Sequence, residues 1–359
     1  MARWTGVLLI VMLTAACQQP PETRIARFFI DYSTGRDPGA VVMVIRDGEP
    51  VFKKAYGMAH LEESVPMVAE SNMRLASVSK QFTAMCIAML VERGKLSLAE
   101  TLMDLFPAFP AYGRDITVAQ LVHHTSGLLA YEDLIPDTAT VQVQDADVLQ
   151  MMLQQDSTYF EPGTKFRYSN TGYALLAMII GKVSGMRFAE FLDENIFQPV
   201  GMTRTVAFAE GVSTVPNRAY GYAVTDSGFV FRDQSLTSAV LGDGGIYSSV
   251  EDLFKWDQIL YTDRLVSRAT FDEAKITAVP TDDKGIHYGF GWRHDEYRGH
   301  ARMHHTGTTC GFSTVVQRYP EDQFSIIILT NRNKPRLWEM ADRIADLYLS
   351  DASQEGASD

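Results

Sequence analysis

The sequence predicts an α/β protein of the α+β type, with strands near both ends of the chain and a mostly helical segment between them. Residues 40–52 contain two apolar runs separated by Asp47-Gly48, which is typical of two strands joined by a tight turn. The β-branched runs at 304–319 and 324–330 predict strands near the other end. The region from about Leu98 to Val240 is expected to be helical or looped. Residues 173–183 and 188–197 of this region have helical patterns. The prolines that interrupt helices here are Pro107, Pro110, Pro136 and Pro162.

Length and charge limit the classes of function. The chain has 359 residues, of which 46% are hydrophobic, enough for a large buried core. Its 32 basic and 44 acidic residues give a net charge of −12, which argues against a nucleic-acid partner and fits a small-molecule or peptide substrate. No metal or cofactor is expected, and the oligomeric state is left open.

The N-terminus predicts a secreted or envelope protein. Arg3, a short apolar stretch and Ala15-Ala16 precede Cys17, which is typical of a secretory signal covering residues 1–16. The stretch is too short to span a bilayer, which needs roughly 20 apolar residues. It resembles a bacterial lipoprotein site, so we expect lipidation at Cys17, a linker over 17–24, and a location on the cell envelope facing the periplasm or exterior. Cleavage and release without lipid is the alternative. Residues 351–359 are small and acidic and are expected to be disordered.

Ser77 and Lys80 are the first candidate catalytic residues. The apolar segment after Ser77 contains strong helix formers and ends at Gly94, which predicts a buried helix with Ser77 in its first turn. Residues three apart on a helix share a face, so Lys80 is placed beside the Ser77 hydroxyl. Apolar surroundings favour a neutral amine, which can accept a proton from a nucleophilic serine. Alternatively, serine simply caps the helix and the lysine extends to solvent.

Tyr168 and Asn170 form a second candidate group. They follow a Pro-Gly turn at 162–163 and place a phenol and a carboxamide in close order. If Tyr168 faces Lys80, the ammonium favours a phenolate, which gives a second base for Ser77 and a proton donor for the leaving group. Asn170 can accept from Lys80 and donate to a substrate carbonyl. The alternative is an ordinary polar loop between helices.

The string His304-His305-Thr306-Gly307-Thr308 predicts one wall of the site. Gly307 lets the backbone approach a ligand closely, so the N–H of Thr308 and the N–H of Ser77 are expected to form an oxyanion hole. His305 is a candidate neutral hydrogen-bonding group or proton relay, and Thr306 a candidate hydroxyl for a substrate carboxylate. A metal site at the histidine pair is disfavoured, because adjacent strand residues point to opposite faces.

These residues resemble the signature of the class C β-lactamase family in its broad sense, which includes β-lactamases, D-alanyl-D-alanine carboxypeptidases, D-aminopeptidases and esterases. The signature S-x-x-K, S-D-N and K-T-G is matched by Ser77-x-x-Lys80, Tyr168-x-Asn170 and His305-Thr306-Gly307. Further matching strings are residues 121–128, 242–249 and 288–292.

The resemblance implies a fold, a division into domains and a set of roles. It implies one antiparallel sheet built from both ends of the chain, flanked by helices, with the site where an inserted helical domain meets it. The sheet domain would cover 25–97 and 241–350 and the helical domain 98–240. By resemblance Ser77 forms the acyl-enzyme, Lys80 and Tyr168 are its general base and acid, and His305 occupies the wall position.

Histidine at 305 is the main departure, because true class C β-lactamases usually carry lysine there. A histidine near neutral pH supplies only part of the positive charge that would bind a substrate carboxylate. The favoured function is therefore a serine hydrolase of the D,D-peptidase or esterase type, with β-lactamase as the alternative. A catalytically silent lipoprotein that binds peptidoglycan or a partner protein is the competing hypothesis from another class. Arg293, Arg298 and Arg302 are equal candidates for binding a substrate carboxylate.

Overall fold

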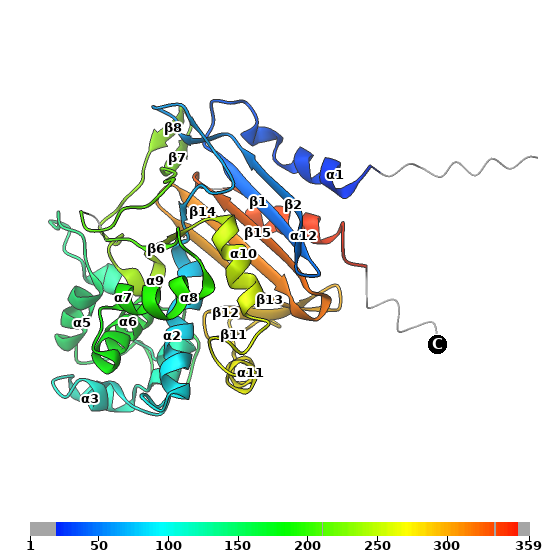
Figure 1. Cartoon of the computed structure of the whole chain (residues 1–359). Helices are drawn as coiled ribbons and strands as arrows, with labels where there is room; N and C mark the ends of the chain where they lie inside the picture. The colour runs from blue at the N-terminus through cyan, green and yellow to red at the C-terminus, as the bar shows by residue number, and fades with distance from the viewer. Residues whose placement is uncertain (1–18, 210, 334, 351–359) are drawn as a thin grey trace, which may run out of the picture.

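The computed structural model describes residues 19–209, 211–333 and 335–350. Its centre is an eight-stranded antiparallel sheet built from both ends of the chain, as expected (Figure 1). In spatial order the strands are β10 (Val279–Pro280), β11 (His287–Gly289), β12 (Trp292–Tyr297), β13 (His300–Thr309), β14 (Phe312–Tyr319), β15 (Phe324–Thr330), β1 (Ala40–Arg46) and β2 (Glu49–Tyr56).

Two groups of helices cover the two faces of this sheet. Alternate residues of a strand point to opposite faces, so Val42 and Val44 pack on α1 (Pro21–Phe28) and α12 (Leu337–Ala345). Val41 and Met43 pack on the opposite side, in the cluster that contains α2 (Lys80–Glu92) and α10 (Val250–Ile259). In Figure 1, α1 and α12 lie on the side of the sheet away from α2.

The middle of the chain is mostly helical, as expected. It contains α3 (Leu102–Leu105), α4 (Val118–Val122), α5 (Asp145–Leu153), α6 (Asn170–Ser184), α7 (Phe188–Leu192) and α8 (Gln198–Val200), with the 3₁₀ turns η3 (Ala111–Asp115) and η4 (Tyr131–Leu134). A π-helical turn, η5 (Asp193–Phe197), joins α7 to α8. Three short strands also lie here, β6 (Val206–Ala207), β7 (Tyr222–Thr225) and β8 (Gly228–Phe231).

The remaining elements connect these parts. They are the 3₁₀ turn η1 (Ile30–Tyr32), β3 (Met58–His60), β4 (Val65–Pro66), β5 (Met73–Arg74), α9 (Leu241–Gly244), β9 (Ile246–Ser248), α11 (Arg268–Ile276) and η6 (Pro320–Asp322). One cluster of buried side chains extends from Val41 in the sheet to Leu121 and Ile179 in the helical segment. The two parts therefore share a core, and their division into separate domains stays a prediction.

The structure changes two expectations near the chain ends. The helix α1 begins at Pro21, so the second half of the expected linker 17–24 is helical. The helix forms there because Ile25 and Phe29 share a face that is buried against the sheet. The strand pattern over 304–319 is a hairpin that turns at Cys310-Gly311 between β13 and β14. The expected signal peptide, Cys17 and the acidic tail lie outside the described residues. None of the described helices combines the length and apolar character needed to cross a bilayer.

Candidate active site

Ser77 lies in the 3₁₀ turn η2 (Ala76–Ser79), which leads directly into α2 at Lys80. It therefore precedes α2 rather than lying in that helix's first turn. The residue before it, Ala76, has a φ of 50°, in the left-handed region that side-chain-bearing residues rarely adopt. Backbone strain of this kind costs about 1–3 kcal/mol and is concentrated at functional sites. Strands β9 and β14 hold the turn: the N–H of Ile246 donates to Ser79 Oγ at 3.3 Å, and the N–H of Leu75 donates to the Ile246 oxygen at 2.8 Å. The hydroxyl of Thr314 donates to the Leu75 oxygen.

Lys80 is fully buried and its amine meets three oxygens. Its Nζ lies 3.2 Å from Ser77 Oγ, 2.8 Å from Asn170 Oδ1 and 2.7 Å from the backbone oxygen of Asp243. The amine therefore cannot extend to solvent, which excludes the alternative inferred from the isolated motif. With two oxygens fixing its position, Lys80 is aligned on the Ser77 hydroxyl at hydrogen-bonding distance.

Tyr168 lies beside Lys80, as expected, with Lys80 Nζ 4.9 Å from the centre of its ring. Its hydroxyl is buried and has no hydrogen-bond partner among the described residues. Most buried hydroxyls are paired, so an unpaired one next to a candidate nucleophile is available to a substrate or to a proton in transfer.

His124 holds the Tyr168 segment in place. Its Nδ1 accepts from the N–H of Ser169 at 3.1 Å, and its backbone oxygen accepts from the N–H of Arg167 at 2.9 Å. Its ring packs against those of Tyr168 and Tyr288. Burial lowers the pKa of His124 well below its usual value, so the ring is neutral and can accept at Nδ1. His124 therefore holds the Tyr168 segment through these hydrogen bonds.

Asn170 is the first residue of α6, and the side chain of Ser169 caps that helix by accepting from the N–H of Gly172 at 3.2 Å. Its Oδ1 accepts from Lys80, as expected. Its Nδ2, however, donates to Glu132 Oε1 at 2.7 Å instead of pointing freely toward a substrate. Glu132, in η4, thereby fixes which end of the amide faces Lys80. No motif surrounds Glu132, so this contact could not be predicted from the sequence.

Asp243 presents its backbone to Lys80 from α9. Burial raises the pKa of Asp243 to about 6, and the carboxyl receives a hydrogen bond from the Tyr131 hydroxyl at 3.0 Å. The start of α9 is fixed by Asp145, whose oxygens accept from the N–H groups of Leu241 and Gly242 at 2.9 and 3.0 Å. Burial raises the pKa of Asp145 to about 7. The matching string at residues 242–249 thus helps to position Lys80 through the backbone oxygen of Asp243.

His305 is buried in β13 and makes two contacts. Its Nδ1 lies 2.7 Å from the backbone oxygen of Thr306, and its Nε2 lies 3.2 Å from the Tyr288 hydroxyl. These contacts assign the proton to Nδ1 and make Nε2 the acceptor. Burial, with a smaller effect from the charge of Lys80, lowers the pKa of His305 to about 3. The ring is therefore neutral and hydrogen-bonded, one of the two states expected for it, and it supplies no part of the positive charge considered for this position.

Gly307 allows a close approach, but to protein and not to a ligand as expected. A Cβ at this position would lie 2.2 Å from the backbone oxygen of Leu75 and 3.0 Å from the Cβ of Ala76. The hydroxyl of Thr314, opposite Gly307 in β14, donates to the same Leu75 oxygen at 2.9 Å. Thr306 and Thr308 alternate with Gly307 and are exposed. The sheet thus packs directly on the turn that carries Ser77, and its two threonines remain accessible.

The three arginines proposed for a substrate carboxylate are not equivalent. Arg302 is buried and forms ion pairs with Asp295 at 2.6 Å and Asp342 at 2.9 Å, so it is part of the structure. Arg298 pairs with Asp346 after α12, on the opposite side of the sheet. Arg293, opposite His304 in β12, is partly exposed and pairs with the exposed Asp283 at 3.4 Å. Its charge helps to lower the pKa of His305. Of the three, Arg293 alone lies close to the candidate site.

Comparison with known proteins decides the family. The Beta-lactamase family model matches residues 25–349, nearly the whole described chain. The chain belongs to this family. The family supports hydrolase activity and implies the serine mechanism. The fold of this chain is similar to that of the penicillin-binding protein from Bacillus halodurans, with a TM-score of 0.79 and 26% identity. The match covers 90% of this chain and 99% of that one.

Two curated relatives are longer than the matched region. Penicillin-binding protein 4* of Bacillus subtilis is 33% identical over 317 residues, covering 84% of this chain and 69% of that protein. Protein flp of Staphylococcus aureus is 25% identical over 338 residues, covering 91% of this chain and 66% of that protein. The chain thus spans about two thirds of the length of these relatives.

Proposed function

We propose that this chain is a secreted or envelope-anchored serine hydrolase that cleaves an amide or ester through an acyl-enzyme on Ser77. The observation that carries the proposal is the placement of Lys80 Nζ 3.2 Å from Ser77 Oγ, with Asn170 and the Asp243 backbone holding the amine. A silent binding protein has no chemical need for this buried amine, because burying a lysine without a function is costly.

The proposed chemistry has two halves. Ser77 Oγ attacks the substrate carbonyl, and its proton passes to Lys80 Nζ, which acts as general base. The Tyr168 hydroxyl, unpaired among the described residues, relays a proton to the departing nitrogen or oxygen. Water then attacks the acyl ester, gives its proton to the same pair, and releases the acid and Ser77. The N–H groups of Ser77 and Thr308 are proposed to stabilise the oxyanion in both halves.

The histidine at position 305 is the reason to propose a D,D-peptidase or esterase rather than a β-lactamase, because by resemblance true class C β-lactamases usually carry lysine there. A lysine at position 305 would bring a fixed positive charge toward a substrate carboxylate. His305 is neutral, and its two ring nitrogens are hydrogen-bonded to the Thr306 backbone oxygen and the Tyr288 hydroxyl. Arg293 is the proposed carboxylate partner. The similarity to penicillin-binding protein 4* agrees with acylation by penicillin, which needs only the nucleophile and the oxyanion hole.

A substrate panel tests this function. Wild type and Ser77→Ala would be assayed with p-nitrophenyl esters, peptides ending in D-Ala-D-Ala, and nitrocefin, and both would be exposed to a fluorescent penicillin. We expect turnover of an ester or peptide, slow turnover of nitrocefin, and penicillin labelling of wild type only. Rapid nitrocefin turnover would assign a β-lactamase instead, and activity that survives in Ser77→Ala would remove Ser77 from the mechanism.

The envelope location is proposed from the sequence around Cys17 alone. Mass spectrometry of the N-terminal peptide from protein made in a bacterial host tests it. We expect a chain that begins at Cys17 with a thioether-linked diacylglycerol. A chain that begins at an unmodified residue would instead indicate cleavage and release.

A further inference from the structure

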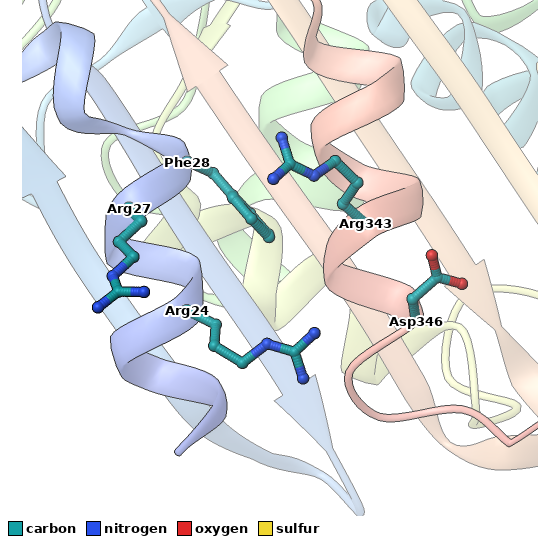
Figure 2. A pocket seen from close by; sticks show the side chains of 5 residues that line it. All are labelled: Arg24, Arg27, Phe28, Arg343 and Asp346. Carbon is teal, nitrogen blue, oxygen red and sulfur yellow. The ribbon is translucent and has the colours of Figure 1, made fainter. Parts of the chain in front are cut away.

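A pocket of about 320 Å³ lies between α1 and α12, on the face of the sheet opposite α2. Its lining consists of Arg24, Arg27 and Phe28 from α1, and Arg343 and Asp346 at α12. In Figure 2, Arg24 and Phe28 extend from α1 toward α12, and Arg343 extends from α12 toward α1. Arg27 extends along the other side of α1 and forms the outer rim.

The pocket is basic on a protein whose net charge is −12. The lining contains three guanidinium groups and one carboxylate. That carboxylate, of Asp346, already accepts from Arg298 at 2.6 Å and from the Tyr297 hydroxyl at 3.0 Å. No carboxylate among the described residues forms an ion pair with Arg24, Arg27 or Arg343. Like charges repel, so three such groups in one small pocket indicate a site for an anion.

One arginine is held in position before any ligand arrives. The guanidinium carbon of Arg343 lies 3.9 Å from the centre of the Phe28 ring. Stacking of this kind uses the face of the guanidinium and leaves its in-plane N–H groups free for an acceptor. Planar N–H pairs match the oxygens of a phosphate, which is why arginine is common in phosphate sites. The chemistry of the pocket therefore fits a phosphate ester better than a single carboxylate.

The location of the pocket indicates where such a phosphate comes from. The helix α1 begins at Pro21, four residues after Cys17. A fully extended chain of four residues spans at most about 14 Å. A lipid on Cys17 would therefore keep α1 close to the headgroups of the membrane. Ser77 lies between Leu75 and Val78, which belong to the cluster on the opposite face of the sheet.

We propose that this pocket, formed by Arg24, Arg27, Phe28 and Arg343, binds the phosphate of anionic phospholipid headgroups. The ligand source rests on the proposed anchoring at Cys17; the anion site itself does not. Binding would add a second attachment to a single lipid anchor and would turn the face that carries α1 and α12 toward the membrane. The catalytic residues would then face away from it.

Vesicle binding tests the proposal without the anchor. The chain from Gln18 onward retains every described residue and lacks both the apolar leader and Cys17. Its sedimentation would be measured with phosphatidylglycerol vesicles and with phosphatidylcholine vesicles at low salt. We expect binding to the former only, lost at high salt, and about fivefold weaker for each of Arg24→Gln, Arg27→Gln and Arg343→Gln. Asp346→Asn should strengthen binding, because it removes the one negative charge of the pocket.

Matched controls separate the pocket from general charge effects. Arg114→Gln makes the same charge change at an exposed site in η3 and should leave binding nearly unchanged. Arg343→Lys keeps the charge and controls for a loss of packing on Phe28, and penicillin labelling of Ser77 should be equal in all variants. Equal binding to both vesicle types, or an equal effect of Arg114→Gln, would overturn the proposal. Inorganic phosphate and soluble glycerophosphoglycerol would be compared as competitors at millimolar concentration. If both release the protein from phosphatidylglycerol vesicles equally well, the pocket binds free phosphate, and the membrane role is overturned.

Discussion

A buried lysine with three oxygen neighbours is the central feature at the scale of single residues. Lys80 Nζ contacts the Ser77 hydroxyl, the Asn170 carboxamide and the Asp243 backbone. The last two contacts are provided by α6 and α9, so the position of the amine depends on two elements distant from α2 in the sequence. In the proposed mechanism the amine is positioned before substrate arrives, so little reorganisation is needed at the moment of proton transfer.

Lys80→Met should slow acylation of Ser77 by about 10²- to 10⁴-fold, the usual contribution of a general base. Methionine has a similar length and suits a buried position, so the fold should persist. The second-order rate of fluorophosphonate labelling measures the effect. Lys95→Met, an exposed position just after α2, is the control and should label at the wild-type rate. An unchanged rate in Lys80→Met would mean that another group activates Ser77.

His305 makes a prediction about pH. Its pKa is lowered in the folded protein to about 3, from the 6.5 of an exposed histidine. Between these values the unfolded chain binds a proton that the native chain does not, so this group lowers the free energy of unfolding as pH falls from about 6.5 toward 3. The loss is at most about 1.4 kcal/mol for each pH unit. Above about pH 6.5 the group has no such effect.

Comparison with His305→Gln isolates this group, because Asp145 and Asp243, whose pKa values are raised by burial, act in the opposite direction as pH falls. Urea unfolding of both proteins at about pH 7 and about pH 4.5 measures the difference. We expect wild type to lose more stability than the variant between the two values. The kcat/KM profile should show no step near pH 6.5 from His305. An equal loss in both proteins would show that His305 becomes protonated without cost in the fold.

At this scale the sequence predicted which candidate catalytic residues lie together better than it predicted what surrounds them. Ser77, Lys80 and Asn170 belong to short strings with a known chemical logic, and the structure brings them together. Glu132 could not be predicted, because its contact with Asn170 depends on how η4 folds over α6. For His305 the sequence left open a neutral hydrogen-bonding group or a proton relay, because complete burial, which makes the ring neutral, is not revealed by a residue's neighbours in sequence.

At the scale of elements, the site depends on how closely β13 packs on η2. Gly307 permits this packing, because any Cβ there would lie 2.2 Å from the Leu75 oxygen. The string around Gly307 predicted a close approach of the backbone to a ligand. In the structure the backbone at Gly307 instead approaches the Leu75 oxygen. The strand pattern could not identify that partner, because Leu75 and Gly307 are more than 200 positions apart in the chain.

Gly307→Ala should therefore displace β13 from the turn that carries Ser77. We expect a loss of about 1–3 kcal/mol in the free energy of unfolding, typical of an overpacked site, together with slower labelling of Ser77. Gly181→Ala in α6 is the control, because its Cβ would meet only the Met186 oxygen, at 3.4 Å, and alanine favours a helix. Equal stability of Gly307→Ala and wild type would contradict the close packing described here.

Long elements with a clear period were predicted better than short ones. The hairpin β1–β2 follows from its apolar runs and its Asp-Gly turn, and α2 from its helix formers. The strands β6, β7 and β8 have two to four residues and lie within the segment expected to be helical or looped. Strands this short carry no readable period, and β6 exists because β9 pairs with it.

At the scale of the whole molecule, one core joins the sheet to the helical segment and the candidate catalytic residues converge at their junction. Ser77 and Lys80 precede the helical segment, Tyr168 and Asn170 lie within it, and His305 follows it. The resemblance of the motifs implied this convergence, and the match of the Beta-lactamase family model over residues 25–349 agrees with it. Three separated segments can form one site only if the whole chain folds around them.

Formation of an acyl-enzyme on Ser77 is the central claim, and peptide mapping after treatment with a fluorophosphonate tests it most directly. Digestion and mass spectrometry of the treated wild type should locate one adduct on the peptide that contains Ser77, and no adduct in Ser77→Ala. An adduct on a different residue, or equal modification of the two proteins, would contradict the account.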